Sequence, residues 1–146
     1  MEGNADSWAG REMSGGELVI EGNAGEYLGS SYRGETIGMK GGRIVVKGNA
    51  GDFVGEHMGG GEIIVEGNVG IMAGMGMRGG KIVIKGDAIL PGAEMLDGMV
   101  IVEGKVLEML PGFRYEGEEE INGKKMKKYV GDLAVRGIGK GFLFVR

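Results

Sequence analysis

The chain repeats one short motif five times, and this repetition constrains its fold more than any other feature. Each copy begins with paired glycines or their equivalent, continues with a Val- and Ile-rich segment and ends in a further glycine. The copies are GGELVIEGNAGEYLG (15–29), GGRIVVKGNAGDFVG (41–55), GGEIIVEGNVGIMAG (60–74), GGKIVIKGDAILPG (79–92) and DGMVIVEGKVLEMLPG (97–112). The glycines that close the strand segments are Gly22, Gly48, Gly67, Gly86 and Gly104, at spacings of 26, 19, 19 and 18 residues. This period predicts a right-handed parallel β-helix with coils of about nineteen residues, and an inserted loop at Ser30–Thr36.

The strand segment of each copy alternates polar and apolar residues, which is the period-two pattern of a strand with one buried face. The residues expected to line the interior are Leu18 and Ile20, Ile44 and Val46, Ile63 and Val65, Ile82 and Ile84, and Val100 and Val102. The opposite face carries one β-branched residue per copy, and these residues are Val19, Val45, Ile64, Val83 and Ile101. They predict an apolar stripe down the outside of the stack. Because contiguous apolar surface usually marks a contact, we expect either the C-terminal tail or another subunit to cover it.

The charged positions on either side of this stripe alternate in sign from copy to copy. One row runs Glu17, Arg43, Glu62, Lys81, and the other runs Glu21, Lys47, Glu66, Lys85, Glu103. Equivalent positions of adjacent coils in a β-helix lie about 4.8 Å apart, where opposite charges attract and like charges repel. The alternation therefore predicts that sequential copies stack in register. A propeller or a chain of separated repeats would impose no such rule.

Other residue types recur at fixed places in the repeat. The recurring residues are methionines (Met13, Met39, Met58, Met77, Met95), large apolar residues (Trp8, Tyr27, Phe53, Met72) and asparagines (Asn23, Asn49, Asn68). Asparagine tolerates left-handed backbone and can form stacked ladders. The repeat glycines are assigned to corners, where glycine adopts positive φ and avoids a Cβ clash. These structural corner glycines are Gly22, Gly25, Gly29, Gly48, Gly51, Gly55, Gly67, Gly70 and Gly74.

Residues 1–112 form the predicted repeat region, and residues 113–146 form a tail that packs on it within a single domain. Gly3 lies 19 residues before Gly22, so the repeat is expected to start mid-coil. Glu2 would then lie beside Glu21 and break the alternation of charge. In the tail, the dipeptide at 122–123, Asn-Gly, predicts a type I′ hairpin between strands 114–121 and 124–130. The segment GKGFLFVR predicts a final strand that protects the last coil from edge association.

No complete active site emerges from the sequence. Residues 74–79, GMGMRG, spell a dinucleotide fingerprint, but a strand is expected to follow them where the fingerprint requires a helix. His57 is the single histidine, and without further nearby ligands for a zinc site it is assigned to a surface corner. Asp132 is expected to cap a turn, and residues 137–141 to form one. We predict no catalytic, cofactor-binding or metal-binding residue and no nucleophile–base pair.

Composition excludes several classes of protein. The chain has 34 Gly and 2 Pro in 146 residues, and the glycines do not recur at every third position as in collagen. It contains no Cys, which excludes disulfides and iron–sulfur ligation by this chain. A net charge of −4 offers no basic footprint for nucleic acid. No apolar run approaches the roughly twenty residues that span a membrane, and no secretory signal is evident, so a cytoplasmic protein is expected.

The glycine spacing Gly22-x-x-Gly25-x-x-x-Gly29, repeated from Gly48 and from Gly67, resembles the glycine-repeat β-helix family. That family includes the C-terminal domain of the glutamate synthase large subunit and the glycine-repeat C component of formylmethanofuran dehydrogenase. The tail segments MLPGFRYEG (109–117) and KKYVGDLAVRGIGKGFLFV (127–145) resemble the end of the dehydrogenase component. The resemblance covers nearly the whole chain, although family members usually carry more residues at the N-terminus.

The resemblance implies a non-catalytic scaffold subunit of an oxidoreductase complex that reduces CO2 and attaches the product to methanofuran as a formyl group. The molybdenum or tungsten pterin and the iron–sulfur clusters would belong to other protein subunits, with no cofactor bound by this chain. A related assembly transfers or hydrolyses formyl groups on similar one-carbon carriers. Two alternatives remain open: a glutamate-synthase-type structural domain, and a free-standing β-helix that associates with itself. No nucleic-acid or membrane partner is expected.

Overall fold

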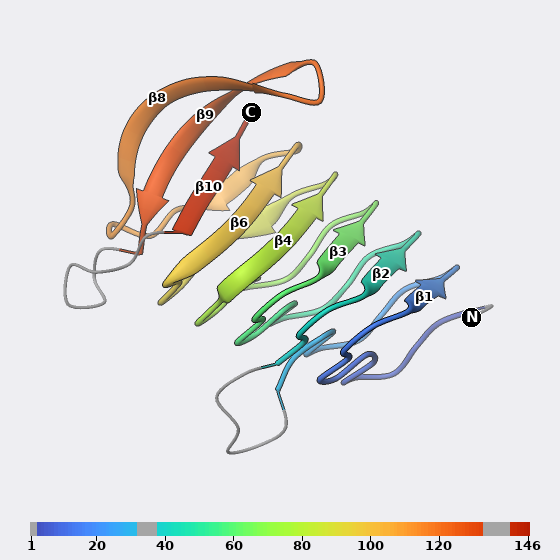
Figure 1. Cartoon of the computed structure of the whole chain (residues 1–146). Helices are drawn as coiled ribbons and strands as arrows, with labels where there is room; N and C mark the ends of the chain where they lie inside the picture. The colour runs from blue at the N-terminus through green and yellow to red at the C-terminus, as the bar shows by residue number, and fades with distance from the viewer. Residues whose placement is uncertain (1–2, 32–37, 133–140) are drawn as a thin grey trace.

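The computed structural model describes residues 3–31, 38–132 and 141–146, and these form an all-β arrangement in which no helix occurs (Figure 1). The strands are β1 (Glu17–Ile20), β2 (Arg43–Val46), β3 (Glu62–Val65), β4 (Arg78–Ile84), β5 (Ala88–Ile89), β6 (Asp97–Val102), β7 (Val106–Glu108), β8 (Arg114–Ile121), β9 (Lys124–Gly131) and β10 (Gly141–Val145). Across the described part of the chain, no helix is long and apolar enough to cross a membrane. The predicted all-β class is confirmed. Glu2, most of the insertion at Ser30–Thr36 and the turn at 137–140 lie outside the described residues.

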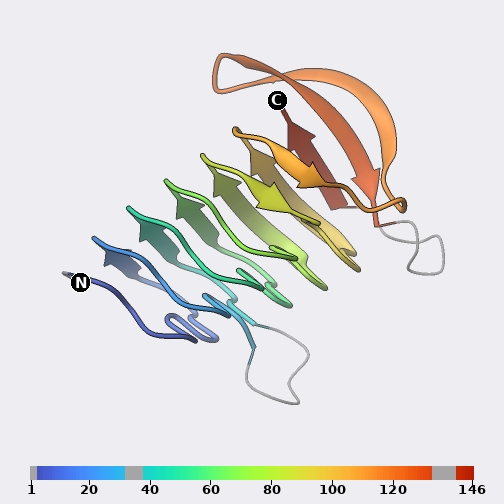
Figure 2. The same cartoon turned by 180° about the vertical axis from the view of Figure 1, so that it is seen from behind.

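The principal sheet has eight strands in the order β1-β2-β3-β4-β6-β10-β9-β8, and it is parallel from β1 to β10. Figure 1 shows β1, β2, β3, β4 and β6 side by side along the stack, with the rest of each repeat returning behind them, and Figure 2 shows these returning segments from the other side. The short strands β5 and β7 pair in parallel in a second sheet. This mostly parallel stack is compatible with a β-helix, and we call one repeat, from one strand of the principal sheet to the next, a coil.

Sequential strands pair in register, as the alternating charges predicted. Glu17 lies opposite Arg43, and Arg43 lies opposite Glu62. Glu62 in turn lies opposite Lys81. Stacked positions just after the strands are separated by 19, 26, 19, 19 and 18 residues. The 26-residue step keeps the same hydrogen-bonding pattern as its neighbours, so the insertion does not disturb the stack.

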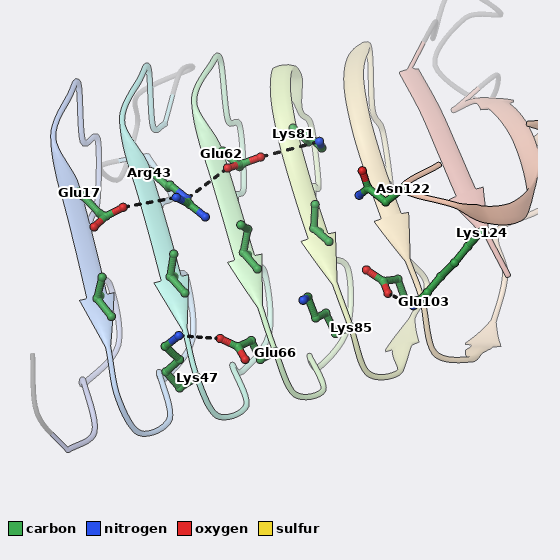
Figure 3. A pocket seen from close by; sticks show the side chains of 14 residues that line it. Glu17, Arg43, Lys47, Glu62, Glu66, Lys81, Lys85, Glu103, Asn122 and Lys124 are labelled. Carbon is green, nitrogen blue, oxygen red and sulfur yellow. Dashed lines mark hydrogen bonds and ion pairs between the residues drawn. The ribbon is translucent and has the colours of Figure 1, made fainter. Parts of the chain in front are cut away.

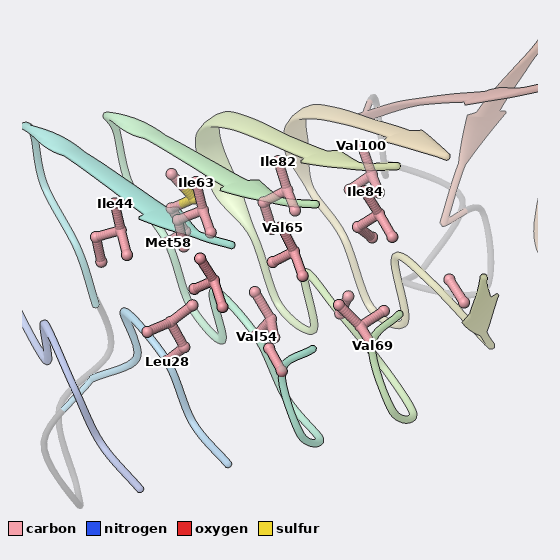
Figure 4. Packing of buried hydrophobic residues seen from close by; sticks show 14 of the residues in the cluster. Leu28, Ile44, Val54, Met58, Ile63, Val65, Val69, Ile82, Ile84 and Val100 are labelled. Carbon is pink, nitrogen blue, oxygen red and sulfur yellow. The ribbon is translucent and has the colours of Figure 1, made fainter. Parts of the chain in front are cut away.

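The interior of the stack is a continuous apolar core (Figure 4). Of the residues predicted to face inward, all but Leu18 are fully buried, and Leu18 is half-buried. The recurring methionines also lie inside: Met39, Met58, Met77 and Met95 have 0% exposure. A flexible thioether fills irregular gaps well, which suits a buried position that recurs once in each coil.

The tail forms the predicted hairpin, with Asn122 and Gly123 both at positive φ between β8 and β9. The last strand, β10, pairs in parallel with β6 and antiparallel with β9. It therefore occupies the place of a next strand in the stack, although the hairpin precedes it in the chain. The edge of β6 is covered in this way, as the sequence predicted for the final segment.

At the corners, the residues that adopt left-handed backbone are not all the ones that were predicted. Positive φ occurs at Gly29, Gly55 and Gly74, but not at the other corner glycines of the predicted set or at the repeated asparagines. Glu12, His57 and Glu94 adopt it at one corner position. At another, large residues adopt it, namely Trp8 (φ 70°), Tyr27 (φ 59°), Phe53 (φ 60°), Met72 (φ 57°) and Leu90 (φ 51°). Their amides donate to carbonyl oxygens of the next coil at 2.8–2.9 Å. Their aromatic rings stack, with 4.2 Å between the centroids of Trp8 and Tyr27 and 5.0 Å between those of Tyr27 and Phe53. Stacking and interstrand bonding offset the backbone strain of about 1–2 kcal/mol that each such residue carries.

Candidate functional site

The outer face of the principal sheet forms a groove of about 610 Å³ that crosses β1 to β4 and ends at the hairpin (Figure 3). We call it the outer groove. Its floor consists of Val19, Val45, Ile64 and Val83, four of the five residues of the predicted apolar stripe. Val45 is 8% exposed and Val83 is 6% exposed, so the floor lies low between its walls. The walls are the two rows of charged residues, although Glu21, the first residue of its row, lies outside the lining of the groove.

The first wall, called the Glu17 row, is held together by ion pairs along its length. Arg43 contacts Glu17 at 3.6 Å and Glu62 at 3.3 Å. Lys81 contacts Glu62 at 3.8 Å. Arg43 therefore bridges carboxylates on both neighbouring strands and Lys81 pairs with the carboxylate on β3, which is the arrangement predicted from the alternation of sign.

The second wall, called the Glu21 row, is paired less completely. Lys47 contacts Glu66 at 3.1 Å, and Lys124 of the hairpin contacts Glu103. Glu21 and Lys85 are exposed and, in the part of the chain that the structure describes, make no ion pair. This row thus carries one carboxylate and one ammonium group that remain available for an external partner.

The C-terminal hairpin closes one end of the groove. Met126 is 1% exposed and packs in a second apolar cluster with Val83, Ile101 and Phe144. Ile121 packs against the same cluster, and Asn122 and Lys124 line the end of the groove. Of the two coverings expected for the stripe, the tail therefore accounts for the C-terminal end. Val19 and Val45 stay outside this second cluster and form the open part of the floor.

The corner glycines act mainly through close contact between coils. A Cβ on Gly48 or Gly67 would overlap the side-chain oxygen of the asparagine in the preceding coil. A Cβ on Gly51 would lie 3.0 Å from the backbone of the coil before it. At Gly29 and Gly55 it would meet the δ-methyl of an interior isoleucine, at 2.8 and 2.6 Å. These positions build the stack and contribute no polar group to the outer groove.

The repeated asparagines form a ladder that joins side chain to backbone. The Oδ1 of each accepts the amide hydrogen of the equivalent residue one coil further on, at 2.8 Å. Asp87 continues the ladder by accepting from the Lys105 amide at 2.8 Å. The sequence predicted a stacked ladder here, but not that the backbone would be its donor.

Ser31 and His57 form a side-chain contact that was not predicted from the sequence. Ser31 Oγ lies 3.2 Å from His57 Nδ1. They are 26 residues apart, and the signal that could have joined them is their place at the same corner of adjacent coils. Ser31 is only 4% exposed, the imidazole lies against Gly76 of the next coil, and neither residue lines the outer groove. This contact therefore links adjacent coils.

The remaining candidates have structural surroundings. Residues 74–79 lead directly into β4, and Gly74 and Gly76 have positive φ, which is the predicted corner geometry. Asp132 is 4% exposed, and its Oδ2 accepts the Glu94 amide at 3.0 Å, so it caps a corner of the last coil. Within residues 3–31, 38–132 and 141–146, no group of three His, Asp or Glu residues is arranged to hold a metal ion.

Among solved structures, the chain is similar to a chain of the formyltransferase/hydrolase complex (FhcABCD) from Methylorubrum extorquens, determined in complex with methylofuran. The two share 30% sequence identity, and the TM-score is 0.88. The similarity covers 99% of this chain and 63% of that one, so this chain spans less than two thirds of the length of its structural relative. No protein-family model and no curated protein sequence matches it.

Proposed function

We propose that this chain is a non-catalytic scaffold subunit of a complex that handles formyl groups on a furan-containing one-carbon carrier. The observation that carries the proposal is the similarity, over 99% of the chain, to a chain of a formyltransferase/hydrolase complex. The tail segments that resemble the glycine-repeat component of formylmethanofuran dehydrogenase point to the same chemistry. Both assemblies place a formyl group on, or remove it from, a methanofuran-type carrier.

The distribution of functional groups supports a scaffold role. The outer groove has an apolar floor and walls of paired charges, which suit a protein surface and not a small reacting molecule. The contact between Ser31 and His57 lies away from the outer groove and joins adjacent coils. The chain has no cysteine, so it supplies no thiolate to an iron–sulfur cluster. Catalysis would belong to the partner subunits.

The proposal includes the finer architecture, a right-handed β-helix with coils of about nineteen residues. Parallel strands joined by a crossover within one sheet are right-handed in ~98% of cases. The separations of 19, 26, 19, 19 and 18 residues between stacked positions support the coil length. A stiff stack of this kind would hold partner subunits at a set distance.

Affinity purification of the tagged full-length chain from native extract tests the role. We expect it to bring down larger subunits with formyltransferase or formyl-carrier hydrolase activity, while an untagged strain gives none. Bound molybdenum or tungsten with iron in the recovered complex would assign the dehydrogenase type. Absence of those metals from an active complex would assign the transferase/hydrolase type. Recovery of the chain without any of these subunits would overturn the proposal.

A further inference from the structure

The exposed part of the charged walls occupies an even number of coils. In the coil of β6, Glu103 is 16% exposed and paired with Lys124 of the hairpin, and Met99 takes the next place in the Glu17 row. The wall residues of β1 to β4 that form ion pairs keep side-chain exposures of 34–54%, although Val83 of β4 already packs in the hairpin cluster (Figure 3). Along these four strands each wall reads Glu, Lys or Arg, Glu, Lys in the direction of the stack. A row that alternates in sign over an even number of places becomes complementary to itself when it is reversed.

We propose that the outer groove docks a second copy of this chain, face to face, about a two-fold axis that runs along the strand direction between β2 and β3. This rotation keeps the strand direction and reverses the stack, so β1 faces β4 of the partner copy and β2 faces β3. Every charge then meets its opposite. In the Glu17 row, Glu17 faces Lys81 and Arg43 faces Glu62 of the other copy. In the Glu21 row, Lys47 faces Glu66.

The two unpaired charges of the Glu21 row supply an independent observation. Glu21 and Lys85, which make no ion pair within the described residues, face each other across the proposed interface. They do so twice, because an isologous interface repeats each contact. A two-fold axis along the stack would also bring the faces together, but it would place Glu17 against Glu21 and Arg43 against Lys47. That alternative is repulsive at every coil.

The floor contributes less to this arrangement than the walls. Val19 would lie opposite Val83 and Val45 opposite Ile64, but Val45 and Val83 are only 8% and 6% exposed, and Val83 already packs in the hairpin cluster, so the charged walls carry most of the contact. The hairpin tip lies beyond β4, so it would flank the β1 edge of the partner copy. The face between the Glu17 row and the Glu21 row on four coils spans roughly 19 Å by 16 Å, which is a small footprint beside the ~800 Å² that each partner buries in a standard interface. We therefore expect a weak dimer that loosens as salt screens the charged walls.

Sedimentation velocity of the purified full-length chain, over a concentration series, tests the proposal. We expect a dimer at the upper concentrations, and its dissociation in about 0.5 M sodium chloride. Glu21→Lys and Lys85→Glu should each weaken the dimer at least about tenfold, and the double variant should restore it because it exchanges both charges. Lys105→Glu, which removes an exposed lysine away from the groove, is the matched control. The stack itself gains repulsion in the double variant, so rescue of the dimer cannot come from rescue of stability.

Disulfide trapping gives a second readout, since the natural chain has no cysteine. In Glu21→Cys/Lys85→Cys the two thiols of one chain lie three coils apart, roughly 14 Å, which is too far for an internal disulfide. Oxidation should therefore yield a covalent dimer, whereas Glu21→Cys/Lys105→Cys should yield none. A monomer at all concentrations, no change in the single variants, or equal trapping in both cysteine pairs would overturn the proposal. Groove occupancy by a different subunit would show itself as a monomer in isolation.

Discussion

The glycines that close each strand segment are needed because the backbone of the preceding coil lies directly beneath them. At Gly67 a Cβ would lie 2.7 Å from the carbonyl oxygen of Gly48 and would overlap the side-chain oxygen of Asn49. The φ of Gly67 is not positive, so the requirement is for space and not for backbone freedom. The asparagine ladder brings the side-chain oxygen to this point, and the two features therefore depend on each other.

Gly67→Ala should lower the free energy of unfolding by about 2 kcal/mol, because backbone of the adjacent coil cannot move aside cheaply. Gly15→Ala is the matched control, since Gly15 has ordinary φ and nothing within 4 Å of its Cβ position. That variant should be neutral or slightly stabilising, through loss of freedom in the unfolded chain. Urea denaturation of both variants measures the difference. Equal stability of the two would show that the coils are not in close contact at Gly67.

Residue-level features were predictable where a column repeats one residue type and not where it varies. The methionine and asparagine columns could be read directly, because each recurs in register. The left-handed backbone at Trp8, Tyr27 and Phe53 could not, since bulky residues seldom adopt it and nothing in their spacing marks it. The contact between Ser31 and His57 could not be predicted, because Ser31 belongs to the insertion that breaks the regular spacing.

At the scale of the strand, the charged walls are ladders in which each side chain depends on the strands beside its own. Lys47 on the coil of β2 contacts Glu66 at 3.1 Å, and Glu21 occupies the preceding place in the row. Both members of the contact are partly exposed, at 46% and 38%. Such pairs contribute modestly, so their value lies in specifying register more than in stability.

Lys47→Glu should destabilise the fold by ~1 kcal/mol, because it places three carboxylates in successive places and removes the contact with Glu66. Lys47→Gln should show a smaller loss. Raising the ionic strength should reduce the difference between the two variants, which thermal denaturation at low protein concentration would measure. If the difference persisted in high salt, packing of the lysine stem would be the cause in place of charge.

The tail shows why element-level prediction was only partly possible. The hairpin followed from its Asn-Gly turn, but the turn carries no information about which face the hairpin covers. That choice depends on the apolar surface of Met126 and Ile121 meeting Val83, Ile101 and Phe144. The sequence allowed either the tail or another subunit to cover the apolar stripe. Only the side-chain positions show how far along the stripe the tail extends.

At the scale of the whole molecule, the stack is close to one-dimensional, since each coil contacts mainly its neighbours. The central strands β2, β3 and β4 each pair on both sides. β1 pairs with β2 alone within the described residues, and the segment that follows β1 meets the first coil through the Ala5–Ala24 bridge and the bond from the Gly22 amide to the Gly3 carbonyl oxygen. Local stability should therefore fall from the centre toward β1.

Hydrogen–deuterium exchange should reveal this gradient. Amides of β3 should exchange most slowly, and those of residues 3–16 should exchange fastest among the repeats, because fewer buried contacts hold them. The β10 amides should be protected at a level close to that of β6, since β10 pairs with β6 on one side and β9 on the other. Uniform exchange along the stack would indicate a single cooperative unit instead.

The alternation of sign in the walls has a consequence for how such a chain can change in length over evolution. Duplication or loss of one coil would bring two glutamates or two lysines together in both walls at the junction, whereas duplication or loss of two coils would leave every contact intact. The column of Glu12, Gly38, His57, Gly76 and Glu94 shares this rhythm, with a side chain at every second coil and a glycine between. Coils would therefore be gained or lost in pairs, although the sequence motif recurs in every coil. Relatives of this chain should differ in length by multiples of about 38 residues.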